Sequence, residues 1–237
     1  MDNKLNLAKF IDHTLLKPYA TESDIQQLCD EAQEYGFFSV CVHPFHIKTA
    51  KKSLSGTNVY PVRKKQGISS NRVKVSTVIG FPLGMTLTQV KIYEAMEAVL
   101  SGADELDIVI NLGAVKAGKW KMVKKEISDL VTVTPKALHK IIIECSYLSD
   151  DEKIKASLAS LEAGAEFVKT STGFAPTGAD LRDVETIKTA TKGKIGIKAA
   201  GGIKTLKEVL GLLRAGASRI GTSSGVTIMK SYSSCKR

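Results

Sequence analysis

Cysteine is scarce in this chain of 237 residues, and its spacing is not that of a metal cluster. The four cysteines, Cys29, Cys41, Cys145 and Cys235, are widely separated, and no two of them form a C-x-x-C pair. This spread argues against a zinc cluster and against a disulfide framework. We therefore expect reduced thiols in a cytoplasmic protein.

Long apolar runs and clustered aromatic residues are missing as well. No stretch approaches the ~20 apolar residues that span a bilayer, and residues 1–6 contain no apolar signal core. The two densest basic stretches, 63–65 and 116–125, are not interleaved with stacking aromatics as in a single-strand binder. We expect no membrane and no nucleic-acid partner, and the net charge of +10 would favour a phosphorylated small molecule.

Short runs rich in Val, Ile and Phe alternate with longer segments of helical periodicity. Strands separated by one helical segment each are typical of repeated βαβ units and a parallel sheet. The pattern predicts eight strands, at residues 10–14, 39–43, 73–79, 105–111, 140–145, 167–171, 195–199 and 219–223.

The helix ends carry recurring signals. The pattern Leu-x-x-Gly-Ala occurs three times and places Gly102, Gly164 and Gly216 just past a helix, where a left-handed residue is favoured. Thr21 and Ser149 are each followed by acidic residues and are expected to cap the helices that they precede. The repeated helix-to-strand connection indicates one repeated structural unit and not several unrelated domains.

Eight strands with intervening helices predict a single (β/α)8 barrel, a TIM barrel, over residues 1–237, with a short N-terminal helical segment. An open doubly wound sheet is the alternative, but the first strand is followed by Leu-Leu-Lys-Pro and not by a glycine-rich loop. The basic insertion at 57–72 is longer than a barrel loop needs and is expected to be an exposed excursion or hairpin without an assigned function.

Four ionisable residues are expected at the C-terminal ends of the predicted strands, where barrel enzymes collect their catalytic groups: Asp12, Asp107, Lys169 and Lys198. A lysine is rarely buried unless it is paired or used as a neutral amine. One lysine could attack a carbonyl to form a Schiff base, a second cation could keep it deprotonated, and a carboxylate could move protons. A purely structural salt-bridge network is the alternative reading.

Glycines and hydroxyls follow strands seven and eight, the two loops that bind phosphate in many barrels. Gly201 and Gly202 follow the first of these strands, and Ser223 and Ser224 follow the second. Their backbone N–H groups and a helix N-terminus could hold an anion.

Six motifs, found in family order in a match that runs from about Asp12 to Val226, resemble the deoxyribose-phosphate aldolase family. They are Ile11-Asp-His-Thr-Leu-Leu-Lys17, Thr77-Val-Ile-Gly-Phe-Pro-Leu-Gly84, Glu105-Leu-Asp-Ile-Val-Ile-Asn111, Phe167-Val-Lys-Thr-Ser-Thr-Gly-Phe174, Lys198-Ala-Ala-Gly-Gly202 and Arg219-Ile-Gly-Thr-Ser-Ser-Gly225.

The resemblance implies a class I aldolase of deoxyribose phosphate catabolism, which interconverts 2-deoxy-D-ribose 5-phosphate with D-glyceraldehyde 3-phosphate and acetaldehyde. It implies Lys169 as the Schiff-base lysine, Lys198 as the lysine that keeps Lys169 uncharged, Asp107 as the proton donor and acceptor, and Asp12 as a supporting contact. Gly201, Gly202, Ser223 and Ser224 would hold the phosphate. The resemblance further implies no metal or organic cofactor, and a homo-oligomer, a dimer or higher.

The chain departs from the family pattern at two places. Phe174 stands where some family members carry a lysine, so Lys204 could supply the missing charge, and Tyr232 lies near a C-terminus that differs from the family's.

Two other motifs suggest different functions and are rejected. Residues 113–119 match most of a nucleotide-binding loop, but Trp120 replaces the required Ser or Thr. His43 and His46 lack the spacing of a metal-dependent aldolase, whose turnover EDTA would abolish.

Overall fold

The computed structural model describes residues 5–55 and 72–235, so the predicted excursion at 57–72 lies almost entirely outside the described residues. Eight parallel strands close into a barrel in sequence order, and β1 pairs with β8. The predicted (β/α)8 barrel is therefore confirmed, and the open doubly wound sheet is excluded. The strands are β1 (Ile11–Leu15), β2 (Ser39–Val42), β3 (Lys74–Ile79), β4 (Glu105–Val109), β5 (Leu138–Ile142), β6 (Phe167–Lys169), β7 (Gly196–Ala200) and β8 (Arg219–Thr222).

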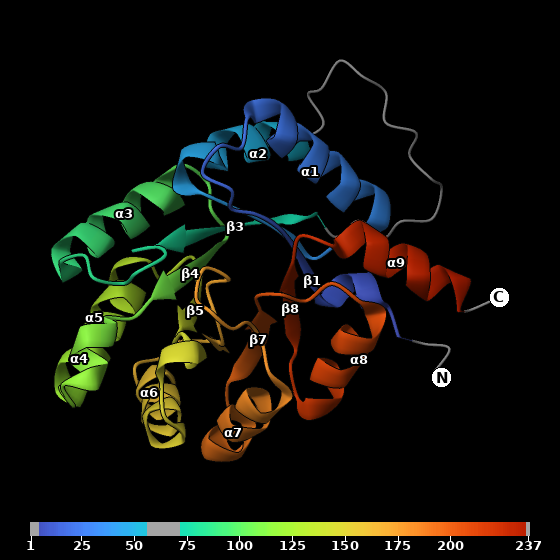
Figure 1. Cartoon of the computed structure of the whole chain (residues 1–237). Coiled ribbons are helices and arrows are strands. Elements are labelled where there is room, and N and C mark those ends of the chain that lie inside the picture. The colour runs from blue at the N-terminus through green and yellow to red at the C-terminus, as the bar shows by residue number, and fades with distance from the viewer. Residues whose placement is uncertain (1–4, 56–71, 236–237) are drawn as a thin grey trace.

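Helices surround the strands on the outside (Figure 1). None of the helices within the two described ranges is both long enough and apolar enough to cross a membrane. The α-helices are α1 (Glu22–Tyr35), α2 (Ile47–Leu54), α3 (Thr88–Leu100), α4 (Leu112–Lys116), α5 (Trp120–Val133), α6 (Asp150–Glu162), α7 (Leu181–Thr191), α8 (Leu206–Ala215) and α9 (Gly225–Ser234).

Residues 5–55 and 72–235 also contain three short 3-10 helices. The first, η1 (Leu7–Phe10), is the predicted N-terminal helical segment and leads directly into β1. The others, η2 (Pro44–His46) and η3 (Cys145–Tyr147), lie shortly after β2 and β5. Helix α4 occupies the glycine-flanked segment that resembled a nucleotide loop, so no phosphate cradle forms there.

The sequence signals at the helix ends are confirmed. Thr21 and Ser149 form capping boxes with Asp24 and Glu152, satisfying N–H groups at the starts of α1 and α6. Gly102, Gly164 and Gly216 have φ values of 105°, 89° and 124°, which side-chain-bearing residues rarely adopt. Each of these glycines lets the chain turn from a helix into the next strand.

The eight observed strands match the eight predicted ones to within three residues at every boundary. The largest difference is at β5, which begins two residues earlier than predicted and ends three earlier. The chain leaves the sheet there because Glu144 adopts a left-handed conformation, with φ 51°. The strands thereby end where their loops converge at the C-terminal face of the barrel.

Candidate active site

A set of charged side chains fills the barrel interior and links six of its eight strands. All of these side chains are buried, and they are joined by ion pairs. Among the described residues, the connected set consists of three carboxylates, Asp12, Glu105 and Asp107, and four cations, Lys140, Lys169, Lys198 and Arg219.

Asp107, on β4, is the centre of this set. Its Oδ2 accepts hydrogen bonds from Lys169 Nζ at 2.8 Å and from Lys198 Nζ at 2.7 Å. Its Oδ1 accepts from Lys140 Nζ at 2.8 Å and from the hydroxyl of Ser76 at 3.1 Å. Three lysines from three adjacent strands therefore converge on one carboxylate.

Asp12 and Arg219 form the deeper part of the set. Asp12 lies 2.6 Å from Lys198 Nζ and accepts a hydrogen bond from Arg219 Nη1 at 2.8 Å and from the Ser39 hydroxyl at 2.7 Å. Arg219 also contacts Glu105 at 3.2 Å, and Glu105 lies 2.7 Å from Lys140 Nζ. The chain of contacts thus runs from the beginning of β8 to the end of β6.

The predicted site residues meet, but deeper in the barrel than a position at the strand ends implies. Asp12 is the second residue of β1, and Asp107 and Lys198 are the middle residues of β4 and β7. Only Lys169 is the last residue of its strand, and its Cα pairs in register with that of Lys198. Lys169 is 2% exposed and Lys198 is 0% exposed, so Lys169 lies nearest to solvent.

The pairing fixes the charge of several groups. Burial by itself would raise the pKa of Asp107, but Lys140, Lys169 and Lys198 hold that pKa well below its usual value. Burial lowers the pKa of Lys198, but Asp107 and Asp12 outweigh it and raise that pKa. The pKa of Lys140 is likewise raised, because Asp107 and Glu105 outweigh the effect of burial. Asp107 is therefore ionised, and Lys140 and Lys198 are cations.

Three members of the set were not identified from the sequence. Lys140 stands directly before an apolar run, and Lys198 stands directly after one. Lys198 was identified as a lysine within a predicted strand, and the same criterion could have identified Lys140. Glu105 and Arg219 begin their predicted strands, where a charged residue ordinarily faces solvent and gives no signal.

A fourth missed residue, Glu144, holds the loop that follows Lys169. Its carboxylate accepts hydrogen bonds from the backbone N–H of Thr172 at 3.2 Å and from the Thr172 hydroxyl. Burial raises the pKa of Glu144. A non-glycine residue in the left-handed region carries strain, which is most common at functional sites.

The predicted phosphate residues lie in the loops after β7 and β8. Gly201 and Gly202 have φ values of 92° and 74°, and a Cβ on Gly202 would meet no described atom within 4 Å. A Cβ on Gly201 would lie 3.0 Å from the Cα of Gly178, so this glycine permits a close approach of two loops. Ser223 is exposed, and Ser224 precedes α9 and donates its N–H to the Thr222 hydroxyl at 2.9 Å.

The remaining candidates divide between the mouth of the barrel and the core. Phe174 is 55% exposed and contacts Phe81 edge-to-face, with ring centroids 5.2 Å apart. Lys204 is exposed just before α8. Tyr232 donates its hydroxyl to Leu5 O at 2.7 Å and is not part of the charged set. Within residues 5–55 and 72–235, no group of His, Cys, Asp and Glu is arranged to hold a metal ion.

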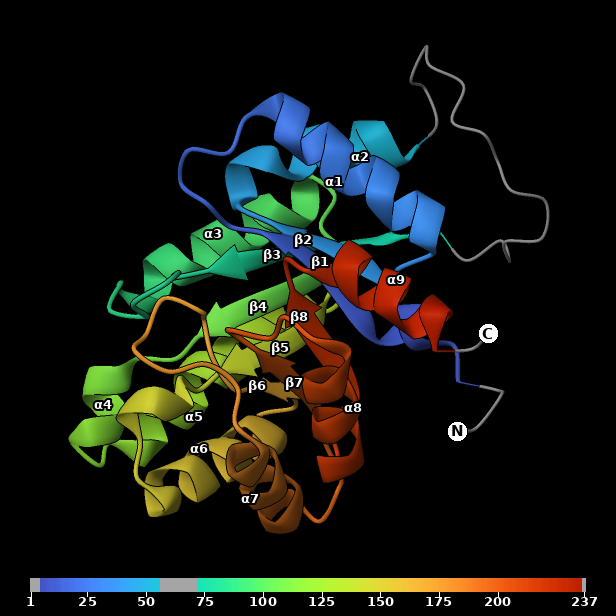
Figure 2. The same ribbon diagram turned by 45° about the vertical axis from the view of Figure 1, so that its right-hand side comes forward.

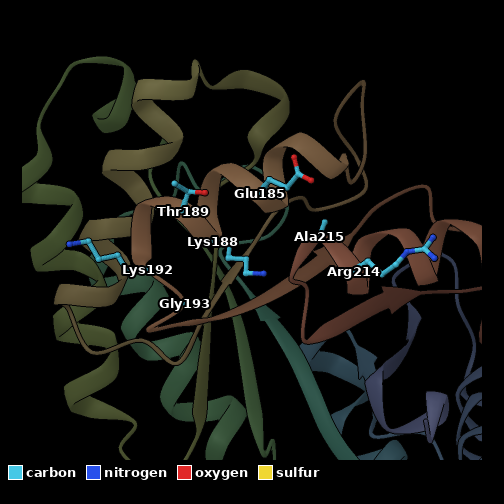
Figure 3. Close-up of a pocket in the computed structure, with 7 residues that line it drawn as sticks. All are labelled: Glu185, Lys188, Thr189, Lys192, Gly193, Arg214 and Ala215. Carbon is cyan, nitrogen blue, oxygen red and sulfur yellow. The ribbon is translucent and has the colours of Figure 1, made fainter. Parts of the chain in front are cut away.

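A hollow on the opposite end of the barrel is unrelated to these residues (Figure 3). It lies at the C-terminal ends of α7 and α8, where the chain enters β7 and β8. Its lining is Glu185, Lys188, Thr189, Lys192, Gly193, Arg214 and Ala215, none of which was predicted as a site residue.

The fold and the buried lysines define the class of the protein, a (β/α)8-barrel aldolase. The family described as DeoC/LacD family aldolase matches residues 7–231. The chain belongs to this family.

Several relatives are similar over nearly their whole length. Deoxyribose-phosphate aldolase of Thermococcus gammatolerans is 51% identical over 95% of this chain and 96% of its own. A solved structure described as QR15, an aldolase, has a TM-score of 0.87 at 43% identity and covers 97% of both chains. A tetrameric deoxyribose phosphate aldolase from Aeropyrum pernix has a TM-score of 0.83 at 34% identity, covering 97% of this chain and 92% of that one.

Proposed function

We propose that this protein, acting as one aldolase domain over residues 1–237, cleaves and forms 2-deoxy-D-ribose 5-phosphate through a Schiff base on Lys169. The products of cleavage are D-glyceraldehyde 3-phosphate and acetaldehyde. Relatives of this length and identity that are named deoxyribose-phosphate aldolase support the substrate. The proposal includes no metal and no organic cofactor, because the iminium formed on a lysine is itself the electron sink.

The observation that carries the proposal is the position of Lys169 within the buried set. Lys140, Lys198 and Arg219 each form ion pairs with two carboxylates, whereas Lys169 forms one, with Asp107. Lys169 also ends its strand and is slightly more exposed than Lys198. Lys169 is therefore the lysine best placed to react with an entering aldehyde.

In the proposed cleavage, Lys169 forms the covalent intermediate and Asp107 transfers the proton. The Lys169 amine adds to the C1 aldehyde of the open-chain sugar, and the carbinolamine loses water to give the iminium. Asp107, through water, accepts the proton of the C3 hydroxyl as the C2–C3 bond breaks and its electron pair forms the enamine. C2 of the enamine is then protonated, and water releases acetaldehyde and regenerates the amine.

The cation of Lys198 has a different task from the amine of Lys169. It is held by Asp107 and Asp12, and it stands beside Lys169 on the neighbouring strand, where its charge opposes a second ammonium. Asp12 supports the site by fixing Lys198, as expected for a positioning residue.

The phosphate would be held at the loops after β7 and β8. The open space above Gly202 and the exposure of Ser223 support this assignment, with Gly201 and Ser224 forming the remaining backbone of the two loops. Because the N–H of Ser224 already donates to Thr222, the hydroxyl of Ser224 is the group left for the substrate. Lys204 is the candidate for the charge that Phe174 cannot supply.

We also propose a cytoplasmic homo-oligomer, a dimer or higher. The four free cysteines suit a reducing compartment. The tetramer reported for the relative from Aeropyrum pernix supports self-association.

Borohydride reduction in the presence of acetaldehyde tests the function. We expect a stable adduct on the peptide that carries Lys169, found by mass spectrometry, and none in Lys169→Arg. Lys188→Arg, a change of an exposed lysine on α7, is the matched control and should still form the adduct. An unmodified Lys169 in folded wild-type protein would exclude the Schiff-base mechanism.

A further inference from the structure

Glu144 is a buried acid that the proposed mechanism does not use. Its side chain is 2% exposed, and it forms no ion pair with any of the described residues. Burial raises its pKa, although the hydrogen bonds from Thr172 and the nearby Lys169 act in the opposite direction. A buried carboxylate without a paired cation is costly, and so is a left-handed backbone on a residue with a side chain. Two unfavourable features in one residue indicate that the residue serves the site.

Lys169 is the residue that needs to be held. Strand β6 has three residues, the fewest of the eight strands, and Lys169 is its last. The chain leaves the sheet directly after Lys169, so the direction of its side chain depends on how the following loop is fixed. In Figure 2 this loop, drawn in orange between β6 and α7, lies at the end of the barrel toward which the strand arrows point.

The backbone on both sides of Glu144 is bonded to the segment that carries Lys169. The N–H of Ile143 donates to Lys169 O at 3.0 Å, and the N–H of Cys145 donates to Thr170 O at 2.8 Å. Glu144 stands between these two donors and turns the chain with its φ of 51°. The turn therefore keeps Glu144 beside the first residues of the loop.

The carboxylate of Glu144 extends this hold along the loop. It accepts hydrogen bonds from the N–H of Thr172 at 3.2 Å and from the Thr172 hydroxyl. The same hydroxyl oxygen accepts the N–H of Phe174 at 3.1 Å. Phe174 in turn packs edge-to-face on Phe81, in the loop after β3. One carboxylate thus anchors the loop between the end of β6 and the far side of the mouth.

We propose that Glu144 is a positioning residue for the Schiff-base reaction: by holding Thr172 it fixes the loop after β6 and directs the Lys169 amine toward the entering aldehyde. Asp107 contacts the amine itself, whereas Glu144 fixes the backbone that carries it. The inference rests on the proposed function, because it assigns Glu144 a task in that chemistry. A reacting group that is displaced by a small distance loses most of its rate advantage.

The chain offers a matched pair of variants for the test. Among the described residues, Glu144 and Lys192 are the two other than glycine with a positive φ, 51° and 53°. Glycine relieves the backbone at both positions, so Glu144→Gly and Lys192→Gly differ in the loss of the buried carboxylate. We expect Glu144→Gly to lower kcat about 100-fold, the scale of a misplaced reacting group, with a much smaller change in KM. Lys192→Gly, which changes an exposed residue at the end of α7, should keep the wild-type kcat.

Turnover is expressed per active site, and the sites are counted as Lys169 peptide trapped by borohydride after long incubation with acetaldehyde. This count removes misfolded protein, so a purely structural role would leave kcat per site unchanged. Thr172→Val, which removes the hydroxyl and keeps the N–H, should lower kcat per site about tenfold, the scale of one lost hydrogen bond. Because Thr172 and Glu144 act together, Glu144→Gly/Thr172→Val should be no slower than Glu144→Gly.

Circular dichroism shows whether Glu144→Gly is folded. If it is not, Glu144→Gln decides, because it keeps the volume and loses one acceptor oxygen, and it should lower kcat per site about tenfold. A wild-type kcat per site in the folded Glu144 variants, or a change confined to KM, overturns the positioning role and leaves the proposed function intact. Wild-type protein that forms no adduct overturns the Schiff-base function and this role with it.

Discussion

Lys198 and Lys169 are neighbours in register, but their surroundings differ. Lys198 contacts two carboxylates and is fully buried, whereas Lys169 contacts one and stands at the end of its strand. The difference supports Lys198 as the fixed charge and Lys169 as the nucleophile of the proposed mechanism. A lysine that is nearer to solvent is also the one that an entering aldehyde meets first.

We expect Lys198→Leu to lower both turnover and stability. The change leaves Asp12 and Asp107 without one of their cations, and breaking a buried pair typically costs about 3–5 kcal/mol. Urea unfolding at neutral pH measures the loss, and single-turnover cleavage should slow by roughly 100-fold or more, the scale of a group that acts on proton transfer. Lys207→Leu, which removes an exposed lysine on α8, should change neither.

The same variant has a predicted pH dependence. In the wild type the pKa values of Asp12 and Asp107 lie below their usual value of 3.8, so their contribution to stability is present above that value and is lost as the pH falls below it. Without Lys198 this contribution is smaller. The gap in unfolding free energy between wild type and Lys198→Leu should therefore narrow in acid, and a gap that widens would contradict the assignment.

At the level of residues, the sequence supplied the two strand lysines and the two aspartates, and the structure brings all four together. It did not supply Lys140, Glu105 and Arg219, which complete the connected set. Lys140 could have been found as a lysine within a strand, whereas Glu105 and Arg219 begin their predicted strands, where no sequence signal distinguishes the barrel interior from solvent. Glu144 was missed because its role depends on a left-handed backbone that no local motif announces.

At the level of elements, two glycine-containing loops meet above the charged set. Gly201 lies against Gly173 and Gly178, and the carbonyl of Gly201 accepts a hydrogen bond from Ala179 N at 3.0 Å. A Cβ on Gly178 would lie 2.1 Å from that carbonyl oxygen. Only glycine permits this approach, which places the loops after β6 and β7 side by side.

Gly178→Ala should therefore separate the two loops and weaken the hold on phosphate. We expect KM for 2-deoxyribose 5-phosphate to rise about tenfold, the scale of one lost ~1.4 kcal/mol interaction, with a smaller change in kcat. Initial rates measured with 2-deoxyribose 5-phosphate and with unphosphorylated 2-deoxyribose check this effect. Gly211→Ala, within helix α8, is the control and should stabilise the protein by about 0.5–1 kcal/mol, because alanine favours helix.

The architecture could be predicted from the sequence because strand and helix periodicities alternate along the chain, with one insertion, at 57–72, between them. The ends of the strands were predicted less accurately than their existence. Strands β4, β5 and β6 end two or three residues before the predicted ends at 111, 145 and 171. The residues left over, such as Thr170 and Ser171, form the loops at the site. Which strands close the barrel depends on the β1–β8 pairing, and no local pattern encodes that pairing.

At the level of the whole molecule, the net charge of +10 should assist the capture of an anionic substrate. Because the Debye length falls from about 30 Å at 0.01 M to 10 Å at 0.1 M salt, we expect kcat/KM for 2-deoxyribose 5-phosphate to decrease severalfold over this range. The uncharged sugar 2-deoxyribose is the control and should show little change. Equal salt dependence for both sugars would show that the surface charge has no part in capture.

Arg219 closes the far end of the barrel. Its guanidinium lies 3.4 Å from the ring centroid of Phe38 and 5.4 Å from that of Phe167, at the beginnings of β2 and β6. In the proposed mechanism the two-carbon fragment stays bonded to Lys169 until water frees it. Glyceraldehyde 3-phosphate would therefore leave first, through the mouth at the other end of the barrel, and acetaldehyde would follow.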